Sequence, residues 1–206
     1  DFVSTYVLHL DEFGKFFAVT KKAAAAATNL FYVTGNIVKA NYGDLAVTYD
    51  TYAKGINAKG EYVTYKIAKD NATSAAAAAA GAAIDTLYQV SVNAATGIAT
   101  LSAPAASSGA AAISNMTGSA WNLSTVPGVV NKATSATGNY YLASDVTIIY
   151  VNDVAANQTK DIAPVVTIKT GVQAVNLDSS DYVIATQQTG TNNWTVNTVI
   201  YNGVAP

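Results

Sequence analysis

The sequence predicts an all-β protein: two small antiparallel β-barrel or β-sandwich domains in tandem, joined by short alanine-rich connectors. Three observations predict this class. Apolar and polar residues alternate with a period of two, the alternating runs are rich in Val, Ile, Thr, Tyr and Phe, and turn residues interrupt them about every 8–12 positions. With 206 residues, 50% of them hydrophobic, the chain is long enough for two cores, because domains commonly run to about 100–150 residues.

Two hairpins are predicted in the first part of the chain. The stretch "TYVLHLDEFGKFFAVT", residues 5–20, has apolar runs on both sides of a polar break, where Gly14 supplies the positive φ of the turn. A strand follows in "NLFYVTGNIVKANYG", which Gly35 and Asn36 are expected to interrupt. The second hairpin joins "DLAVTYDTYAKGI" to "EYVTYKIA" through a turn at residues 57–60, with one apolar and one polar face.

Residues 69–85, "KDNATSAAAAAAGAAID", form the clearest shift in composition. Ser74 can cap a short alanine helix, but Gly81 interrupts it, and isolated helices shorter than about 12–15 residues are marginal in water. An alanine face buries little apolar area, so we expect a connector here and a surface loop at residues 23–27. The first β-domain is therefore placed at residues 1–84 and the second at residues 85–206.

The second part of the chain continues the β pattern. "TLYQVSVNAATGIATLSAP" predicts a hairpin with its turn at residues 93–97, and a polar passage at residues 104–119 follows it. Further strand-like runs lie at residues 121–130, 139–153 and 164–170, and a last hairpin spans residues 181–203 with its turn at residues 188–193.

Composition excludes several classes of function. The chain has no cysteine, so it contains neither disulfides nor thiolate metal sites. It has no arginine, and 11 lysines face 13 acidic residues, which leaves no basic stripe for nucleic acid. The longest run of small apolar residues, 75–84, is about half of the roughly 20 needed for a transmembrane helix. The low charged fraction, 12%, suits a secreted protein. Because the sequence starts at Asp1 without a signal segment, we expect a processed protein or an excised fragment.

A catalytic interpretation begins at His9, the only histidine, with Asp11 two residues later on the same strand face. A Ser–His–Asp triad would need a nearby serine, and the chain has no Gly-x-Ser-x-Gly elbow. The simpler interpretation makes His9 an edge-strand residue and Asp11 and Glu12 turn residues. We therefore predict no catalytic residue and a protein that is not an enzyme.

The other acidic residues give no positive sign of chemistry. Glu12 and Glu61 are the only glutamates, and a glycosidase pair can be far apart in sequence, so spacing does not decide the matter. Aspartates are spread through predicted turns, at Asp44, Asp50, Asp70, Asp153, Asp178 and Asp181. The last two, in "NLDSSD", leave open a weak calcium site, although the EF-hand spacing is absent and an Asx-turn is the plain interpretation. No metal or cofactor site is predicted.

Aromatic residues leave one binding alternative open. Thirteen tyrosines with Trp121 and Trp194 could line a sugar-binding face, although tyrosine in antiparallel sheets more often packs across strands. Trp194 follows a predicted turn, as expected for a cap over the end of a small barrel. Five Asn-x-Ser/Thr triplets, to which we assign no role, start at Asn71, Asn115, Asn122, Asn157 and Asn193.

Several stretches resemble the long β-rich regions of bacterial cell-surface proteins that carry S-layer homology domains at one end. "YVLHLDEFGKFFAV" is similar to their strand, Asp-x-x-Gly turn and strand. "FYVTG" at residues 31–35, "GDLAVTYDTYAKGINAKGEYVTYKIA" at residues 43–68 and "YYLASDVTIIYVND" at residues 140–153 fit the same repertoire. The anchoring domain itself, with its Ile-Thr-Arg-Ala-Glu-like segment, is missing, and the alanine-rich inserts depart from the family pattern.

The resemblance implies an extracellular, wall-associated, non-enzymatic array of small β-domains in a Gram-positive bacterium, anchored through a part outside this stretch. Its role would be structural or adhesive, with cell-wall polymers or neighbouring surface-protein subunits as partners. The alternative is a module that binds carbohydrate or a host protein through exposed Tyr and Trp.

Overall fold

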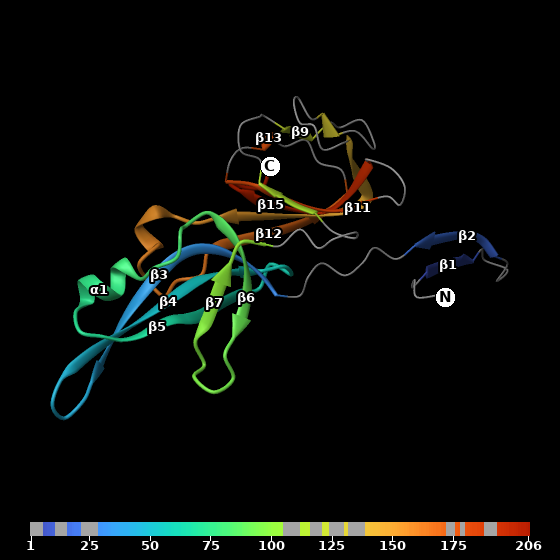
Figure 1. Ribbon diagram of the computed structural model, residues 1–206. Coiled ribbons are helices and arrows are strands. Elements are labelled where there is room, and N and C mark those ends of the chain that lie inside the picture. The colour runs from blue at the N-terminus through green and yellow to red at the C-terminus, as the bar shows by residue number, and fades with distance from the viewer. Residues whose placement is uncertain are drawn as a thin grey trace.

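The computed structural model describes residues 6–10, 16–21, 29–104, 112–115, 121–123, 130–131, 139–171, 176–177, 180–187 and 193–206. The described chain is mostly strand, which confirms the all-β class (Figure 1). Its strands form a two-stranded, a five-stranded and an eight-stranded sheet. No helix among these residues has the length and apolar character that a membrane crossing requires.

The opening hairpin is confirmed. β1 (Tyr6–Leu10) and β2 (Phe16–Lys21) pair antiparallel, with Leu8 opposite Val19 and His9 opposite Ala18. Gly14 and the rest of the predicted turn lie outside the described residues, as do the side chains of both strands.

The five-stranded sheet has the strand order β5-β4-β3-β6-β7, and all its pairs are antiparallel. Its strands are β3 (Leu30–Tyr42), β4 (Val47–Asn57), β5 (Tyr62–Asn71), β6 (Thr86–Val92) and β7 (Ala99–Ser102). The two hairpins predicted within it are confirmed. Gly60 and Gly97 have φ of 80° and 68° in their turns, a backbone region that glycine adopts without a steric penalty.

The predicted break at Gly35 and Asn36 is wrong. β3 runs through both residues, and the strand register shifts between Val33 and Gly35 instead. Such an irregularity lets one strand continue past a residue that the partner strand does not match. β3 therefore continues past Gly35 with a shifted register.

The alanine-rich segment was predicted to be a connector, but it is docked on the five-stranded sheet. It contains α1 (Ser74–Ala79), whose N-cap is Thr73 and not Ser74 as expected. Ala77 is buried, and its carbonyl accepts a hydrogen bond of 2.6 Å from the Thr51 hydroxyl on β4. The Asn36 side chain bonds both the N–H and the carbonyl of Ala82. Tertiary hydrogen bonds thus hold a helix that would be marginal alone.

The eight-stranded sheet has the order β13-β9-β10-β11-β15-β14-β8, with β12 also paired to β11. The predicted strands at 139–153 and 164–170 and the antiparallel pairing of the last hairpin are confirmed. Residues 188–192 of its predicted turn lie outside the described residues, and Asn193 already belongs to a strand. The strands are β8 (Ala112–Asn115), β9 (Trp121–Leu123), β10 (Val130–Asn131), β11 (Asn139–Asn152), β12 (Val165–Thr170), β13 (Asn176–Leu177), β14 (Tyr182–Gln187) and β15 (Asn193–Asn202).

Three features of this sheet correct the sequence predictions. Residues 121–130 contain two strands, β9 and β10, that pair with each other, and the passage at 104–119 contains β8. In addition, β11 and β15 pair in parallel, so the sheet is not wholly antiparallel as expected. Parallel partners need a long connection between them, which the chain from β11 to β15 supplies.

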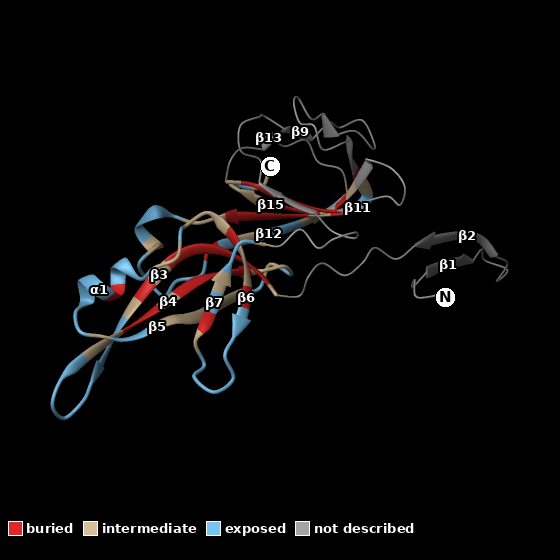
Figure 2. Ribbon diagram, in the orientation of Figure 1, coloured by how far each residue is buried: buried red, intermediate tan, exposed pale blue. Residues whose placement is uncertain are grey.

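Both large sheets carry buried apolar residues on both faces, because alternate residues of one strand enter different clusters. Figure 2 shows buried residues along strands of both sheets. On β3, Phe31 and Val33 belong to a cluster on the outer face of the five-stranded sheet. Leu30 and Tyr32 belong to a cluster shared with the other sheet. This shared core contains Leu30, Tyr32, Ile56 and Leu87 from one sheet and Ile149, Val151, Tyr182, Ile184 and Ile200 from the other.

The predicted boundary at residues 84/85 falls just before β6, which pairs with β3. The five-stranded sheet therefore takes strands from both sides of that boundary, and the shared core does the same. Each large sheet has an open strand order, so the described strands form no closed barrel. The division into two domains stays a prediction.

Candidate functional site: the β11–β12 loop

The β11–β12 loop, residues 153–164, is the main polar contact between the sheets. It includes the 3-10 helix η1 (Ala155–Asn157) and lies against the five-stranded sheet. The N–H of Asn36 donates to the carbonyl of Gln158 at 2.8 Å. Asp161 accepts from Lys39 Nζ and from the Tyr62 hydroxyl, both at 2.9 Å. Backbone and side-chain bonds together fix the loop on β3, β4 and β5.

Lys54 on β4 points from the five-stranded sheet into this loop. Its side chain has no exposed area, and Nζ donates to the carbonyls of Asn157 at 2.7 Å and Ile162 at 2.8 Å. Strand alternation explains the direction, since Ile56, two residues later, is in the core between the sheets. Gly35, opposite Lys54 on β3, leaves the space that the lysine stem crosses.

Asp153, at the start of the loop, is the acidic partner of Lys54. Its Oδ1 lies 3.9 Å from Lys54 Nζ, and its side chain is only 4% exposed. Within the described part of the chain, neither carboxylate oxygen accepts a hydrogen bond. Burial raises the pKa of Asp153, and burial also lowers the pKa of Lys54 despite the attraction of Asp153. Burial thus acts against the charged form of both groups.

A second lysine–aspartate pair behaves in the opposite way. Lys66 Nζ lies 2.5 Å from Asp50 Oδ2, and the lysine side chain is 30% exposed. Their hydrogen bond lowers the pKa of Asp50 and raises the pKa of Lys66, so both groups stay charged. Here the closer pair is an ordinary ion pair, and the more distant Lys54–Asp153 pair is the unusual one.

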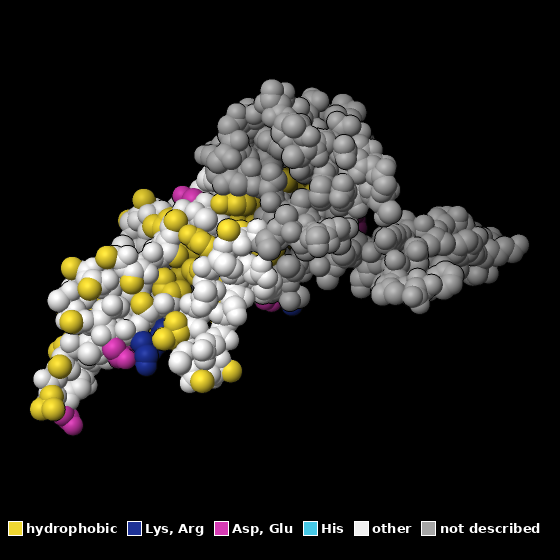
Figure 3. All heavy atoms as spheres, in the orientation of Figure 1, with side chains coloured by type: hydrophobic (Ala, Val, Ile, Leu, Met, Phe, Trp, Pro, Cys, Tyr) yellow, Lys and Arg dark blue, Asp and Glu magenta, His cyan; other side chains and the backbone are white. Residues whose placement is uncertain are grey.

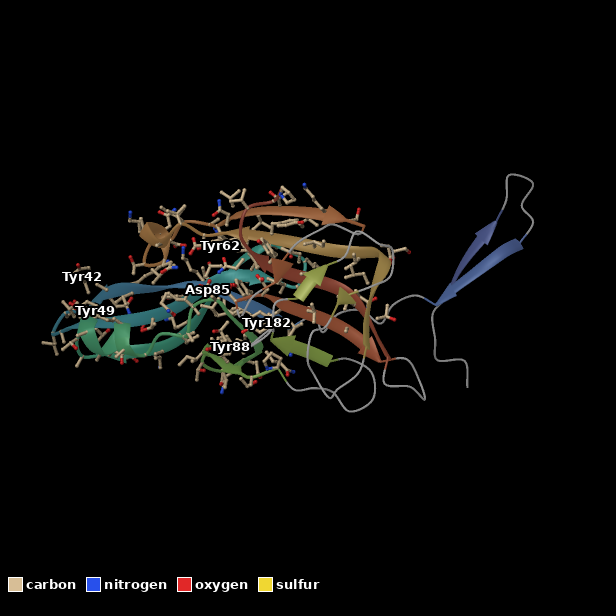
Figure 4. The ribbon with its side chains drawn as sticks, turned by 90° about the horizontal axis from the view of Figure 1, so that it is seen from above. Tyr42, Tyr49, Tyr62, Asp85, Tyr88 and Tyr182 are labelled. Carbon is tan, nitrogen blue, oxygen red and sulfur yellow. The ribbon has the colours of Figure 1, made fainter. Side chains whose placement is uncertain are left out.

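Tyr32 makes a further polar contact between the two large sheets. Its hydroxyl donates to the carbonyl of Ser180 at 3.0 Å and to Asp85 Oδ1 at 3.4 Å, and its ring meets that of Tyr182 edge-on with centroids 5.9 Å apart. Burial, followed by the charges of Asp85 and Asp181, raises the pKa of Tyr32 far above its ordinary value. Figure 4 labels Tyr62, which contacts the β11–β12 loop, and Asp85 and Tyr182, which contact Tyr32. Tyr32 is thus a hydrogen-bond donor and not an acid.

The acidic residues named from the sequence are dispersed. Glu61 accepts a hydrogen bond from Asn57 in the turn before β5, Asp44 is exposed at a hairpin tip, and Asp70 faces Lys69 at 3.5 Å. Asp11, Glu12 and Asp178 lie outside the described residues, while the buried Asp181 accepts the N–H of Asn202 at 2.7 Å. Among the described residues, no three His, Asp or Glu side chains gather as a metal site.

His9 and the two tryptophans lie on strands β1, β9 and β15, but their side chains are not among those the structure describes. Two of the asparagines in the Asn-x-Ser/Thr triplets make hydrogen bonds within the chain. The Asn71 side chain donates to the carbonyl of Tyr49, and Asn157 offers its own carbonyl to Lys54.

Sequence reasoning missed Lys54 and counted Asp153 as a turn residue. The available signal was a lysine inside a strand, two residues before the apolar Ile56 on the same face. Its neighbours in sequence are the small residues Ala53 and Gly55. Its partner belongs to a different sheet, so no local pattern could identify it.

The described tyrosines range from buried through half-buried to exposed. Tyr32, Tyr150 and Tyr182 are buried, whereas Tyr42 is 85% exposed. Tyr42 belongs to the β3–β4 hairpin tip, residues 42–47, where Leu45 is fully exposed. Figure 3 shows hydrophobic side chains gathered at this tip, next to acidic ones.

Comparisons with protein-family models, with curated proteins and with solved structures gave no match.

Proposed function

We propose that this chain is an extracellular structural or adhesive β-module of a bacterial cell-wall or S-layer-associated surface protein, and that it is not an enzyme. The observation that carries the proposal is that both large sheets bury apolar residues on both of their faces. Such packing uses the apolar residues and the largest tyrosines to hold sheets together and suits a load-bearing spacer.

The internal use of the polar groups also supports this role. Lys54, Asp50 and Tyr32, which carry most of the buried polar chemistry of the five-stranded sheet, are bonded to other parts of the chain. The low charged fraction of 12% further fits a protein exposed to a changing extracellular medium.

The resemblance to the β-rich regions of S-layer homology proteins points the same way. On this proposal the chain is a piece of a tandem array of β-domains on a Gram-positive bacterium. Its partners are cell-wall polymers or neighbouring surface-protein subunits, and its attachment lies in another part of the protein.

Cosedimentation with purified Gram-positive cell walls, before and after extraction of the secondary wall polymers, tests the proposal. We expect the chain to pellet with the walls or to assemble with itself, without releasing soluble wall fragments. Release of fragments that is lost in His9→Ala would instead identify an enzyme and would bring the opening hairpin back as a catalytic site.

The β3–β4 hairpin tip favours a second candidate, a module that binds carbohydrate or a host protein. Tyr42 is 85% exposed and Leu45 is 100% exposed, and exposed aromatic and apolar side chains are common in binding surfaces. The double variant Tyr42→Ser and Leu45→Ser should keep the fold. Loss of binding on a glycan array or to host extracellular proteins in this variant would favour the second candidate.

A further inference from the structure

We propose that the side chains of Lys54 and Asp153 condense to form an intramolecular amide bond between Nζ and Cγ, which crosslinks β4 to the β11–β12 loop. The inference rests on the geometry of the pair and is independent of the proposed function.

Two backbone carbonyls fix the position of the Lys54 amine. Nζ of Lys54 has two acceptors, the carbonyls of Asn157 and Ile162, and lies 3.9 Å from Asp153 Oδ1. A neutral amine has only two N–H bonds, and these two carbonyls accept both of them. The nitrogen lone pair is then left for Asp153. The two carbonyls thus orient the amine as a nucleophile.

The carboxyl group of Asp153 is buried in surroundings that disfavour its charged form. Asp153 is 4% exposed, and neither of its oxygens accepts a hydrogen bond within the described part of the chain. An unsolvated carboxylate is costly, so the protonated acid is favoured, and burial raises the pKa of Asp153 accordingly. A protonated acid presents an electrophilic Cγ with a hydroxyl that can leave as water.

The Lys66–Asp50 pair shows why proximity alone does not suffice. Its atoms are closer, at 2.5 Å, but Lys66 is 30% exposed and both groups are held in their charged forms. An ammonium has no lone pair, and a carboxylate is a poor electrophile. Of these two pairs, the Lys54–Asp153 pair is the one in which both side chains are almost fully buried.

The reaction balances without any other reactant. The lone pair of Nζ forms the N–Cγ bond, the Cγ–OH bond breaks, and the hydroxyl takes a proton from Nζ and leaves as one water molecule. The amide keeps one N–H, which still donates to Asn157 or Ile162. A neutral amide replaces two groups whose desolvation opposes burial, and the buried site shields it from hydrolysis.

The crosslink would join the two large sheets, since Lys54 is on β4 and Asp153 directly follows β11. It closes a long loop of the chain and restricts the unfolded state, as other covalent crosslinks do. The expected consequence is resistance to mechanical and thermal separation of the sheets.

Intact mass spectrometry of the whole folded chain, denatured just before measurement, tests the proposal. We expect a mass lower than the sequence mass by one water molecule, and a branched peptide containing Lys54 and Asp153 after digestion. Asp153→Asn should lose ammonia and reach the same mass as the parent, because both reactions give the same product. Lys54→Met should keep its full sequence mass.

The control is the closer pair: Lys66→Met should retain the loss of water. A parent chain that has its full sequence mass after prolonged incubation in the folded state would overturn the proposal, whether or not the variants fold. A loss of water that persists in Lys54→Met would overturn it too, because it would come from a succinimide elsewhere.

Discussion

A Cβ atom on Gly35 would lie 2.1 Å from the carbonyl oxygen of Gln158 and 2.6 Å from Cε of Lys54. The β11–β12 loop therefore approaches β3 more closely than any side chain at this position permits. The hydrogen bond from Asn36 N–H to the Gln158 carbonyl, 2.8 Å long, depends on that approach.

Gly35→Ala should push the loop away from β3 and destabilise the protein by about 1–3 kcal/mol, the usual cost of overpacking. Chemical denaturation measures this change in the free energy of unfolding. Gly43→Ala, at the exposed hairpin tip, is the control and should cost less, because its nearest contact is 3.2 Å away. Equal stabilities of the two variants would mean that the loop does not rest on Gly35.

Stability should fall in acid through the Asp50–Lys66 pair. The pKa of Asp50 is lowered in the folded state from an unfolded value of 3.8, first by the hydrogen bond from Lys66. The stabilisation is therefore present above pH 3.8 and is lost as pH falls through the folded pKa. Asp50→Asn should lose about 1.5–3 kcal/mol at neutral pH and flatten this acid limb. Unfolding curves across pH check it, with Asp44→Asn as an exposed control.

The same pair predicts the alkaline limb. Lys66 has a folded pKa raised above its unfolded value of 10.5, first by the hydrogen bond to Asp50. Its contribution is complete below pH 10.5 and is lost as pH rises through the folded pKa. Lys66→Met should remove this dependence, and thermal melts in alkaline buffers measure it. An alkaline limb unchanged in Lys66→Met would assign the effect to another group.

Tyr32→Phe should destabilise the protein by about 1 kcal/mol, because the partly buried carbonyl of Ser180 and the carboxylate of Asp85 lose a donor. The ring contact with Tyr182 should survive, so the fold should be kept. The control is Tyr42→Phe, whose hydroxyl is on an 85% exposed side chain and should be silent in the same thermal melts. If Tyr32→Phe melts at the same temperature as the parent, the hydrogen bond of the Tyr32 hydroxyl adds nothing to the contact between the sheets.

Thr51→Val should release the alanine-rich segment, since it removes the 2.6 Å hydrogen bond to the Ala77 carbonyl without changing side-chain size much. Limited digestion with an elastase-type protease should then cut residues 74–84 faster than in the parent, because cleavage requires local opening. Thr64→Val, on an exposed position of β5, is the matched control. If both variants are cut at the parental rate, α1 is held by other contacts.

The sequence by itself determined the parts of this protein that depend on neighbouring residues. The turn before β5 is an example: the Asn57 side-chain oxygen accepts the N–H groups of Lys59 and Glu61, at 2.9 and 3.0 Å, and Gly60 takes the positive φ. All these groups lie within a few residues, so composition and spacing were enough to predict the hairpin. The alternation that fills the strands is equally local, which is why the all-β class could be predicted.

The tertiary structure decided whatever joins distant segments. The sequence predicts a strand break at Asn36, yet the strand continues and the Asn36 side chain donates a hydrogen bond to the carbonyl of Ala82. β11 finds a parallel partner in β15. Lys54 meets Asp153 only because one large sheet packs on the other. The alternation of apolar and polar residues predicts which face of a sheet a residue lies on, but not which group covers that face. The covering group is brought there by the packing of the whole chain.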